Sequence, residues 1–222
     1  MTTEQDLSTN NAVPVIAILR GVRPDEVVDI ATALYEAGIR SIEVPLNSPS
    51  PLESISRLSK AFGVTAGSSK CVVGAGTVLT PADVDAVHQN GGGLIVTPNT
   101  EPAVIERAVA LKLDVVPGFA TPSEAFRALQ AGARSLKLFP ASTYGPVHIK
   151  ALRDVLPKGI KLFAVGGVGA ANLTPWLEAG IDGIGVGGEL FRPGYTSDDV
   201  SKRATALVSA WRAATAARTA KP

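Results

Sequence analysis

Eight short apolar runs alternate along the chain with longer segments of helical character, and this alternation restricts the fold more than any other feature. Successive runs start 20 to 30 residues apart, at positions 15, 41, 71, 94, 114, 135, 162 and 183. Each interval has room for one strand, one helix and two short loops. The pattern therefore predicts eight β/α units that build a parallel sheet.

The segments between the apolar runs begin and end with helix signals. Thr80 and Thr121 are each followed by a proline and by an acidic residue three positions after the threonine. This arrangement is typical of a capped helix start. Gly38, Gly132 and Gly180 follow segments of helical pattern and precede the next apolar run, where a left-handed helix end suits glycine. We expect helices between these residues and the neighbouring runs.

Eight β/α units fit either a closed barrel or an open doubly wound sheet. The chain has 222 residues, which suggests one domain or at most two, and no Pro/Gly/Ser-rich linker divides it. Eight is also the number of strands that closes a barrel. We therefore predict an α/β fold with a single (β/α)8 TIM barrel over residues 13–212. We expect flexible segments at residues 1–12 and 213–222.

Composition excludes several classes of protein. Hydrophobic residues make up 45% of the chain, which is too many for a disordered protein, and the net charge of +1 argues against a general nucleic-acid binder. The single cysteine, Cys71, cannot form an internal disulfide, and neither His88 nor His148 has a Cys or His neighbour that would suggest a zinc site. The N-terminus does not look like a signal peptide, and no apolar run is long enough for a membrane span. We expect a cytoplasmic protein.

Two charged residues occupy positions where a barrel strand is buried. Of the nine lysines, only Lys137 lies in the middle of a predicted strand. Because side chains alternate along a strand, Leu136 and Leu138 should face the helices and Lys137 the interior of the barrel. The same rule places Glu43 inside the barrel. Charged side chains are almost never buried without a partner, so the two are expected to lie near each other.

This pair has a structural and a functional interpretation. A buried ion pair without chemistry is possible, but such a pair is often no more stabilising than apolar residues of similar volume. A desolvated lysine has a lowered pKa, so it can attack a carbonyl and form a Schiff base, while a carboxylate moves protons. Lys137 and Glu43 would thus suffice for a class I aldolase without a metal. Two alternatives are an isomerase or epimerase with Glu43 as the base, and a non-catalytic sugar-phosphate sensor.

Glycine pairs follow the last two predicted strands. Gly166 and Gly167 follow the seventh strand, and Gly187 and Gly188 follow the eighth. The loops after strands seven and eight are where TIM barrels commonly bind phosphate through backbone N–H groups. Finding glycines at both loops favours a phosphate site, although a single pair would be a weak signal.

Other residues carry weaker signals. Arg20 ends the first predicted strand, where it could bind a carboxylate or form an ordinary surface salt bridge. The glycines at 74 and 76 bring Thr77 to the end of the third strand. His148 is interpreted as a surface or packing residue.

Six motifs resemble those of the bacterial 2-keto-3-deoxy-6-phosphogluconate and 2-keto-3-deoxy-6-phosphogalactonate aldolases. They occur in the family's order, and the similarity runs from about Val13 to Trp211. The motifs are IAILR at 16–20, EVPLN at 43–47, GAGTV at 74–78, VTPN at 96–99, KLFP at 137–140 and AVGGV at 164–168.

The resemblance implies a site and a reaction. Lys137 matches the Schiff-base lysine and Glu43 the acid/base. The implied substrate-binding residues are Arg20, Thr77, Pro98, Phe139 and Val165, and the implied phosphate-binding residues are Gly166, Gly167, Gly187 and Gly188. The family cleaves phosphorylated keto-deoxy sugar acids reversibly to pyruvate and D-glyceraldehyde 3-phosphate, uses no cofactor or metal, and assembles as a homotrimer.

Two departures from the gluconate-type motifs favour the galactonate branch. The segment after the glutamate reads PLNS, and Val165 lacks the hydroxyl of the threonine found there in gluconate-type enzymes. A gluconate-type or dual-specificity enzyme is the alternative. Some relatives have serine at the position of Gly188, so a phosphate here would depend more on backbone groups or water.

Overall fold

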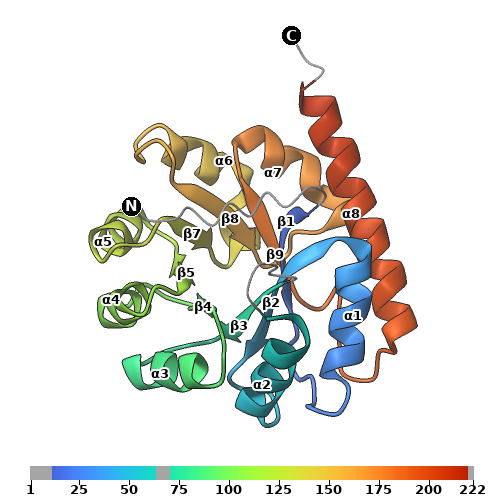
Figure 1. Cartoon of the computed structure of the whole chain (residues 1–222). Coiled ribbons are helices and arrows are strands. Elements are labelled where there is room, and N and C mark those ends of the chain that lie inside the picture. The colour runs from blue at the N-terminus through green and yellow to red at the C-terminus, as the bar shows by residue number, and fades with distance from the viewer. Residues whose placement is uncertain (1–11, 64–70, 220–222) are drawn as a thin grey trace.

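The computed structural model describes residues 12–63 and 71–219, which form a ring of strands surrounded by helices (Figure 1). The strands are β1 (Val13–Ile18), β2 (Ile39–Pro45), β3 (Val72–Gly76), β4 (Leu94–Val96), β5 (Asp114–Val116), β6 (Gly118–Phe119), β7 (Ser135–Leu138), β8 (Lys161–Val165) and β9 (Gly183–Val186). The helices are α1 (Val27–Ala37), α2 (Pro51–Phe62), α3 (Pro81–Gln89), α4 (Pro102–Ala110), α5 (Pro122–Gln130), α6 (Ala141–Arg153), α7 (Leu173–Ala179) and α8 (Ser197–Thr219), with a 3-10 turn, η1 (Ala170–Asn172), before α7.

The strands form one parallel sheet in the order β5-β4-β3-β2-β1-β9-β8-β7-β6. β5 and β6 are the two halves of the single strand expected at 114–118. Pro117 separates them because proline has no N–H to donate to a strand ladder. β5 pairs with β4 and β6 pairs with β7, and the N–H of Lys137 donates to the carbonyl of Pro117 at 2.9 Å. The sheet thus closes through this segment, which confirms the predicted (β/α)8 barrel.

The apolar core has two parts, one on each side of the sheet. The larger part lies between the strands and the helices and includes Leu136 and Leu138. The smaller part fills the barrel interior with Ile16, Leu94, Val96, Val116, Phe163 and Val165. Lys137 is in register with the inward-facing Phe163, so the predicted orientation of the lysine is confirmed.

The helix boundaries follow the local signals in the sequence. Thr80 and Thr121 cap α3 and α5, each with the reciprocal hydrogen bonds of a capping box. Gly38 and Gly180 end α1 and α7 in the left-handed conformation, at φ of 108° and 99°. Gly132 has φ of 102° just beyond the end of α5. These residues set where each helix returns the chain to the next strand.

The C-terminal helix is longer than the sequence pattern indicated. α8 continues to Thr219, beyond residue 212 where we expected a flexible tail to begin. The extra turns contain Ala213, Ala214, Ala216 and Ala217, and alanine has the highest helix propensity. Residues 220–222, and residues 1–11 of the expected N-terminal segment, lie outside the described residues.

Candidate active site

Lys137 and Glu43 are both buried inside the barrel. Lys137 lies on β7 with 6% of its surface exposed, and Glu43 lies on β2 with 2% exposed. The Lys137 Nζ is 5.1 Å from the centroid of the Phe139 ring, two residues further along the same side of the strand. The two predicted catalytic groups therefore share the barrel interior.

Burial changes the pKa of both groups, in opposite directions. Loss of solvent lowers the pKa of Lys137 from 10.5 to about 8, a shift that the negative charge of Glu43 opposes and the positive charge of Arg20 reinforces. Loss of solvent raises the pKa of Glu43 from 4.5 to about 7, against the effect of Lys137 and Arg20. With these values about a tenth of the amine is neutral at pH 7, and the carboxyl can both take up and release a proton.

Gly76 provides the space that the Glu43 carboxyl occupies. A Cβ atom at this position would lie 1.5 Å from Oε2 of Glu43, closer than any real contact. That same Oε2 is buried and has no hydrogen-bond partner among the described residues. A buried carboxyl oxygen without a partner is costly and rare in native proteins, and a catalytic role is one reason for retaining it. From the sequence, this glycine was expected only to help place Thr77 at the end of the third strand.

Thr77 and Pro98 lie just beyond the ends of β3 and β4, at the rim to which β2 and β7 also lead. Thr77 has φ of 57°, an unusual value for a β-branched residue. Strained residues of this kind are found mostly at functional sites. Gly118 lets the chain approach closely here, because a Cβ on it would lie 2.4 Å from the Pro98 carbonyl oxygen. The position of both residues fits their predicted role, and their contact with substrate stays a prediction.

Arg20 is held at the same rim by the loop after β2. Its Nη1 donates to Oδ1 of Asn47 at 2.6 Å, and the N–H of the next residue, Gly21, donates to Oγ of Ser48 at 2.9 Å. Within the described residues Arg20 forms no ion pair, so its interpretation as a surface salt bridge is not supported. Its positive charge acts on both Glu43 and Lys137, which places it at the reacting end of the site.

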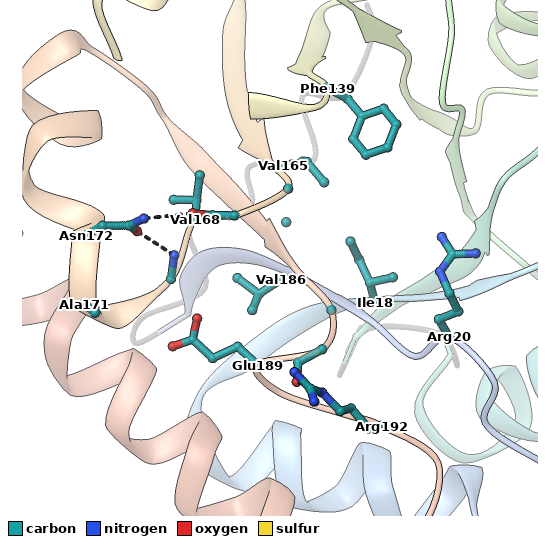
Figure 2. A pocket seen from close by; sticks show the side chains of 16 residues that line it. Ile18, Arg20, Phe139, Val165, Val168, Ala171, Asn172, Val186, Glu189 and Arg192 are labelled. Atoms are coloured by element: carbon teal, nitrogen blue, oxygen red, sulfur yellow. Dashed lines mark hydrogen bonds between the residues drawn. The ribbon is translucent and has the colours of Figure 1, made fainter. Parts of the chain in front are cut away.

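A pocket of about 420 Å³ opens beside this centre, between the loops after β8 and β9 (Figure 2). Seven predicted site residues line it, namely Arg20, Phe139, Val165, Gly166, Gly167, Gly187 and Gly188. Lys137, Glu43, Thr77 and Pro98 are not among its lining residues. Phe139 belongs to the lining and also contacts Lys137, so it joins the pocket to the buried amine.

The glycine loops present backbone donors that the described part of the chain does not use. Among the described residues, no acceptor is found for the N–H groups of Gly166, Gly167, Gly187 and Gly188. Asn172 braces the first loop, since its Nδ2 donates to the Gly167 carbonyl at 2.8 Å and its Oδ1 accepts from Gly169 N–H at 2.9 Å (Figure 2). Free N–H groups in a fixed loop suit a phosphate.

Two charged residues of the pocket were missed in the sequence. Arg192 and Glu189 both follow β9 and line the pocket, and Arg192 Nε donates to the Gly188 carbonyl at 2.9 Å. Oε1 of Glu189 accepts from Ala170 N–H at 3.1 Å. Neither residue lies on a strand, so no alternation pattern marks it. Only the spacing of about four residues from the Gly187–Gly188 pair could have drawn attention to Arg192.

His148, which was interpreted in the sequence as a surface or packing residue, contacts neighbouring parts of the fold. Nε2 of His148 lies 2.8 Å from the Ala120 carbonyl and its ring packs near Tyr144, which fits the predicted packing role. Residues 12–63 and 71–219 contain no cluster of three or more metal-binding side chains. No helix in this part of the chain is long and apolar enough to span a membrane.

Residues 4–205 match the family model described as "KDPG and KHG aldolase". The chain belongs to this aldolase family. It is 48% identical over 201 residues to 2-dehydro-3-deoxy-6-phosphogalactonate aldolase of Escherichia coli, an alignment that covers 90% of this chain and 96% of the relative. The 2-dehydro-3-deoxy-phosphogluconate aldolase of Pseudomonas aeruginosa is 33% identical, covering 74% of this chain and 70% of the relative.

A solved aldolase structure agrees with the fold. The structure titled "Native KDPGal structure" matches with a TM-score of 0.88 and 48% identity, covering 92% of this chain and 97% of that chain. The motif resemblance found in the sequence is therefore confirmed at the level of the aldolase family, across nearly the whole barrel.

Proposed function

We propose that this chain is a class I aldolase that reversibly cleaves 2-dehydro-3-deoxy-6-phospho-D-galactonate to pyruvate and D-glyceraldehyde 3-phosphate. The observation that carries the proposal is the buried Lys137, whose pKa is lowered to about 8 beside an acid/base group with a pKa near 7. The related aldolases support it. The isomerase and sensor alternatives have no comparable support.

The reaction begins at the keto carbon of the substrate. The neutral Nζ of Lys137 attacks this carbon and forms a carbinolamine. The carbinolamine loses water as protonated Glu43 donates a proton to the departing hydroxyl, leaving an iminium. The carboxylate of Glu43 then removes the proton of the C4 hydroxyl, either directly or through a water molecule.

Cleavage follows from that deprotonation. The C3–C4 bond breaks, its electron pair moves onto C3 and the iminium to give an enamine, and C4 leaves as the aldehyde of glyceraldehyde 3-phosphate. Proton return to C3 restores an iminium, and water hydrolyses it to free pyruvate and the amine. A carboxyl whose pKa is near 7 can exchange protons at each step without a large energetic cost.

The remaining predicted residues would bind the two ends of the substrate. Arg20, with Thr77 and Pro98 at the same rim, would hold the carboxylate next to the keto carbon. Phe139 would pack beside the Schiff base, since its ring already lies near the Lys137 amine. The free N–H groups of the glycine loops would donate to the phosphate.

Val165 would set the preference between the two C4 epimers. It is 5% exposed at the end of β8, lines the pocket and offers no hydroxyl. The experiment that tests this part of the proposal compares kcat/KM for the galactonate and gluconate epimers with the purified enzyme. A higher value for the galactonate epimer is expected. A higher value for the gluconate epimer would overturn the assignment, and equal values would show a dual-specificity enzyme.

We also infer a homotrimer. Four of the large apolar side chains that are exposed in the monomer lie on the neighbouring helices α4, α5 and α6, namely Val109, Phe126, Tyr144 and Val147. Val147 is 80% exposed, an unfavourable state that a second copy of the chain would relieve. Sedimentation should give three times the 22.8 kDa chain mass, and Val147→Asp should lower it. A monomeric wild-type protein would contradict this inference.

Because a phosphorylated sugar acid does not cross a membrane unaided, we expect the enzyme to act in the cytoplasm.

A further inference from the structure

The pocket beside the buried pair contains a second guanidinium whose hydrogen-bonding capacity is largely unused. Arg192 donates one hydrogen bond, from Nε to the Gly188 carbonyl at 2.9 Å. Among the described residues its two Nη nitrogens have no hydrogen-bond partner, and no carboxylate forms an ion pair with it. Arginine side chains that line a pocket with their outer nitrogens free are suited to bind an anion through two parallel hydrogen bonds.

Gly188 allows the guanidinium to take this position. A Cβ atom on Gly188 would lie 3.3 Å from Nε and 3.7 Å from Nη2 of Arg192, so the arginine rests directly against the glycine. A side chain at residue 188 would crowd it. The guanidinium of Arg192 therefore lies in the part of the pocket that a side-chain hydroxyl at residue 188 would occupy.

The two arginines of the pocket lie toward different parts of the site. Arg20 follows β1, acts on Lys137 and Glu43 through its charge and is bound by Asn47. Arg192 follows β9, and it is not among the groups that shift the pKa of either catalytic residue. Figure 2 shows the two side chains apart from each other, Arg20 next to Ile18 and Arg192 next to Glu189.

A substrate with an anion at each end matches this arrangement. The carboxylate is bonded to the keto carbon that joins Lys137, so it must lie at the Arg20 end. The phosphate is at the other end of the six-carbon chain. We propose that Arg192 is a specificity-determining residue that binds the terminal phosphate, with the free N–H groups of the glycine loops, in place of the missing hydroxyl at residue 188. This inference rests on the proposed function.

Glu189 brings a negative charge to the same pocket, but its carboxylate is already engaged. Oε1 accepts from Ala170 N–H at 3.1 Å, and Oε2 lies against Gly169, where a Cβ would be 1.6 Å away. The carboxylate thus braces the loop after β8 instead of pairing with Arg192. The guanidinium remains available to an incoming anion.

The test uses the synthetic direction, in which pyruvate is added to an aldehyde. Arg192→Ala should raise KM for D-glyceraldehyde 3-phosphate by about 10- to 100-fold, the effect of losing hydrogen bonds to a charged group. The rate with unphosphorylated D-glyceraldehyde should not change. Arg192→Lys should recover part of the loss, because it keeps the charge but not the two-pronged geometry. Arg57→Ala, which removes an exposed arginine on α2 that is paired with Glu53, is the matched control and should change neither value.

Two readouts separate this inference from the proposed function. Borohydride trapping of pyruvate should proceed equally in wild type and Arg192→Ala; a wild-type enzyme that traps nothing would refute the proposed function itself. Binding of inorganic phosphate, measured by calorimetry, should weaken in Arg192→Ala. If pyruvate is trapped normally but phosphate binding and KM for the phosphorylated aldehyde are unchanged in Arg192→Ala, the role of Arg192 is refuted alone. Equal losses with both aldehydes would also refute it.

Discussion

The two ends of the site are built in different ways. At the reacting end, Lys137 and Glu43 are charged side chains fixed on strands and almost fully buried. At the glycine end, the donors are backbone N–H groups of two loops and the exposed guanidinium of Arg192 around an open pocket. Burial is what changes the pKa of the reacting groups, so the chemistry requires the closed barrel interior. Binding an anion requires donors that water and substrate can reach.

Substitutions at the reacting end are expected to lower turnover more than substitutions at the glycine end. Lys137→Met should lower kcat by at least about 10⁴-fold, because the nucleophile is lost. It should also raise the unfolding midpoint by a few degrees, since a buried ammonium is removed and Glu43 can become protonated. Steady-state kinetics and thermal unfolding measure the two effects. Lys150→Met, at an exposed position on α6, is the control. Residual turnover near the wild-type rate would contradict the assigned nucleophile.

The next largest effect is expected at the acid/base. Glu43→Gln keeps the size of the side chain and removes its proton exchange, so kcat should fall by about 10²- to 10⁴-fold. Pyruvate should still be trapped on Lys137, although more slowly. The exposed Glu106→Gln on α4 should behave as wild type. A Glu43→Gln enzyme with normal kcat would show that another group carries the protons.

A glycine substitution tests whether the position of Glu43 matters as much as its presence. Gly76→Ala puts a methyl group where Oε2 of Glu43 lies, so the carboxyl must move. Displacing a catalytic group by about 1 Å can cost about 10²-fold in rate. Gly93→Ala is the matched control, because a Cβ at Gly93 meets nothing within 4 Å. Equal kcat values for the two variants would mean that Glu43 tolerates displacement.

The smallest effect is expected on substrate preference. Val165→Thr restores a hydroxyl at the pocket wall and should shift the kcat/KM ratio of the two epimers toward the gluconate form by about 10-fold. Val165 is tightly held, since a Cβ on the neighbouring Gly185 would lie 2.7 Å from its Cγ2. Val28→Thr on α1 should leave the ratio unchanged. An unchanged kcat/KM ratio in Val165→Thr would show that another residue determines the preference between the two epimers.

The sequence revealed the barrel and the reacting pair because both depend on local patterns. Alternation along a strand was enough to place Lys137 and Glu43 inside. The break at Pro117 was also readable in principle, because proline cannot donate to a strand ladder. The extra length of α8 was missed because an alanine-rich end was taken for a tail.

Other features depend on which strands and loops become neighbours. The role of Gly76 follows from the register of β2 against β3, where Pro45 lies opposite that glycine. The position of Arg192 against Gly188 depends on the path of a loop, which no periodicity describes. The bond between Arg20 and Asn47 joins residues 27 apart in the sequence. Such contacts appear only once the barrel has closed.

Covalent capture of pyruvate by the buried amine shows directly whether Lys137 is the nucleophile. The enzyme is incubated with pyruvate, reduced with borohydride and digested, and the peptides are analysed by mass spectrometry. One adduct on Lys137 is expected, formed fastest between about pH 7 and 8, because the attacking amine must be neutral and its pKa is about 8, while the Glu43 carboxyl that donates a proton must be protonated and its pKa is about 7. No adduct at saturating pyruvate, or an adduct only on another of the nine lysines, would show that Lys137 is not the nucleophile.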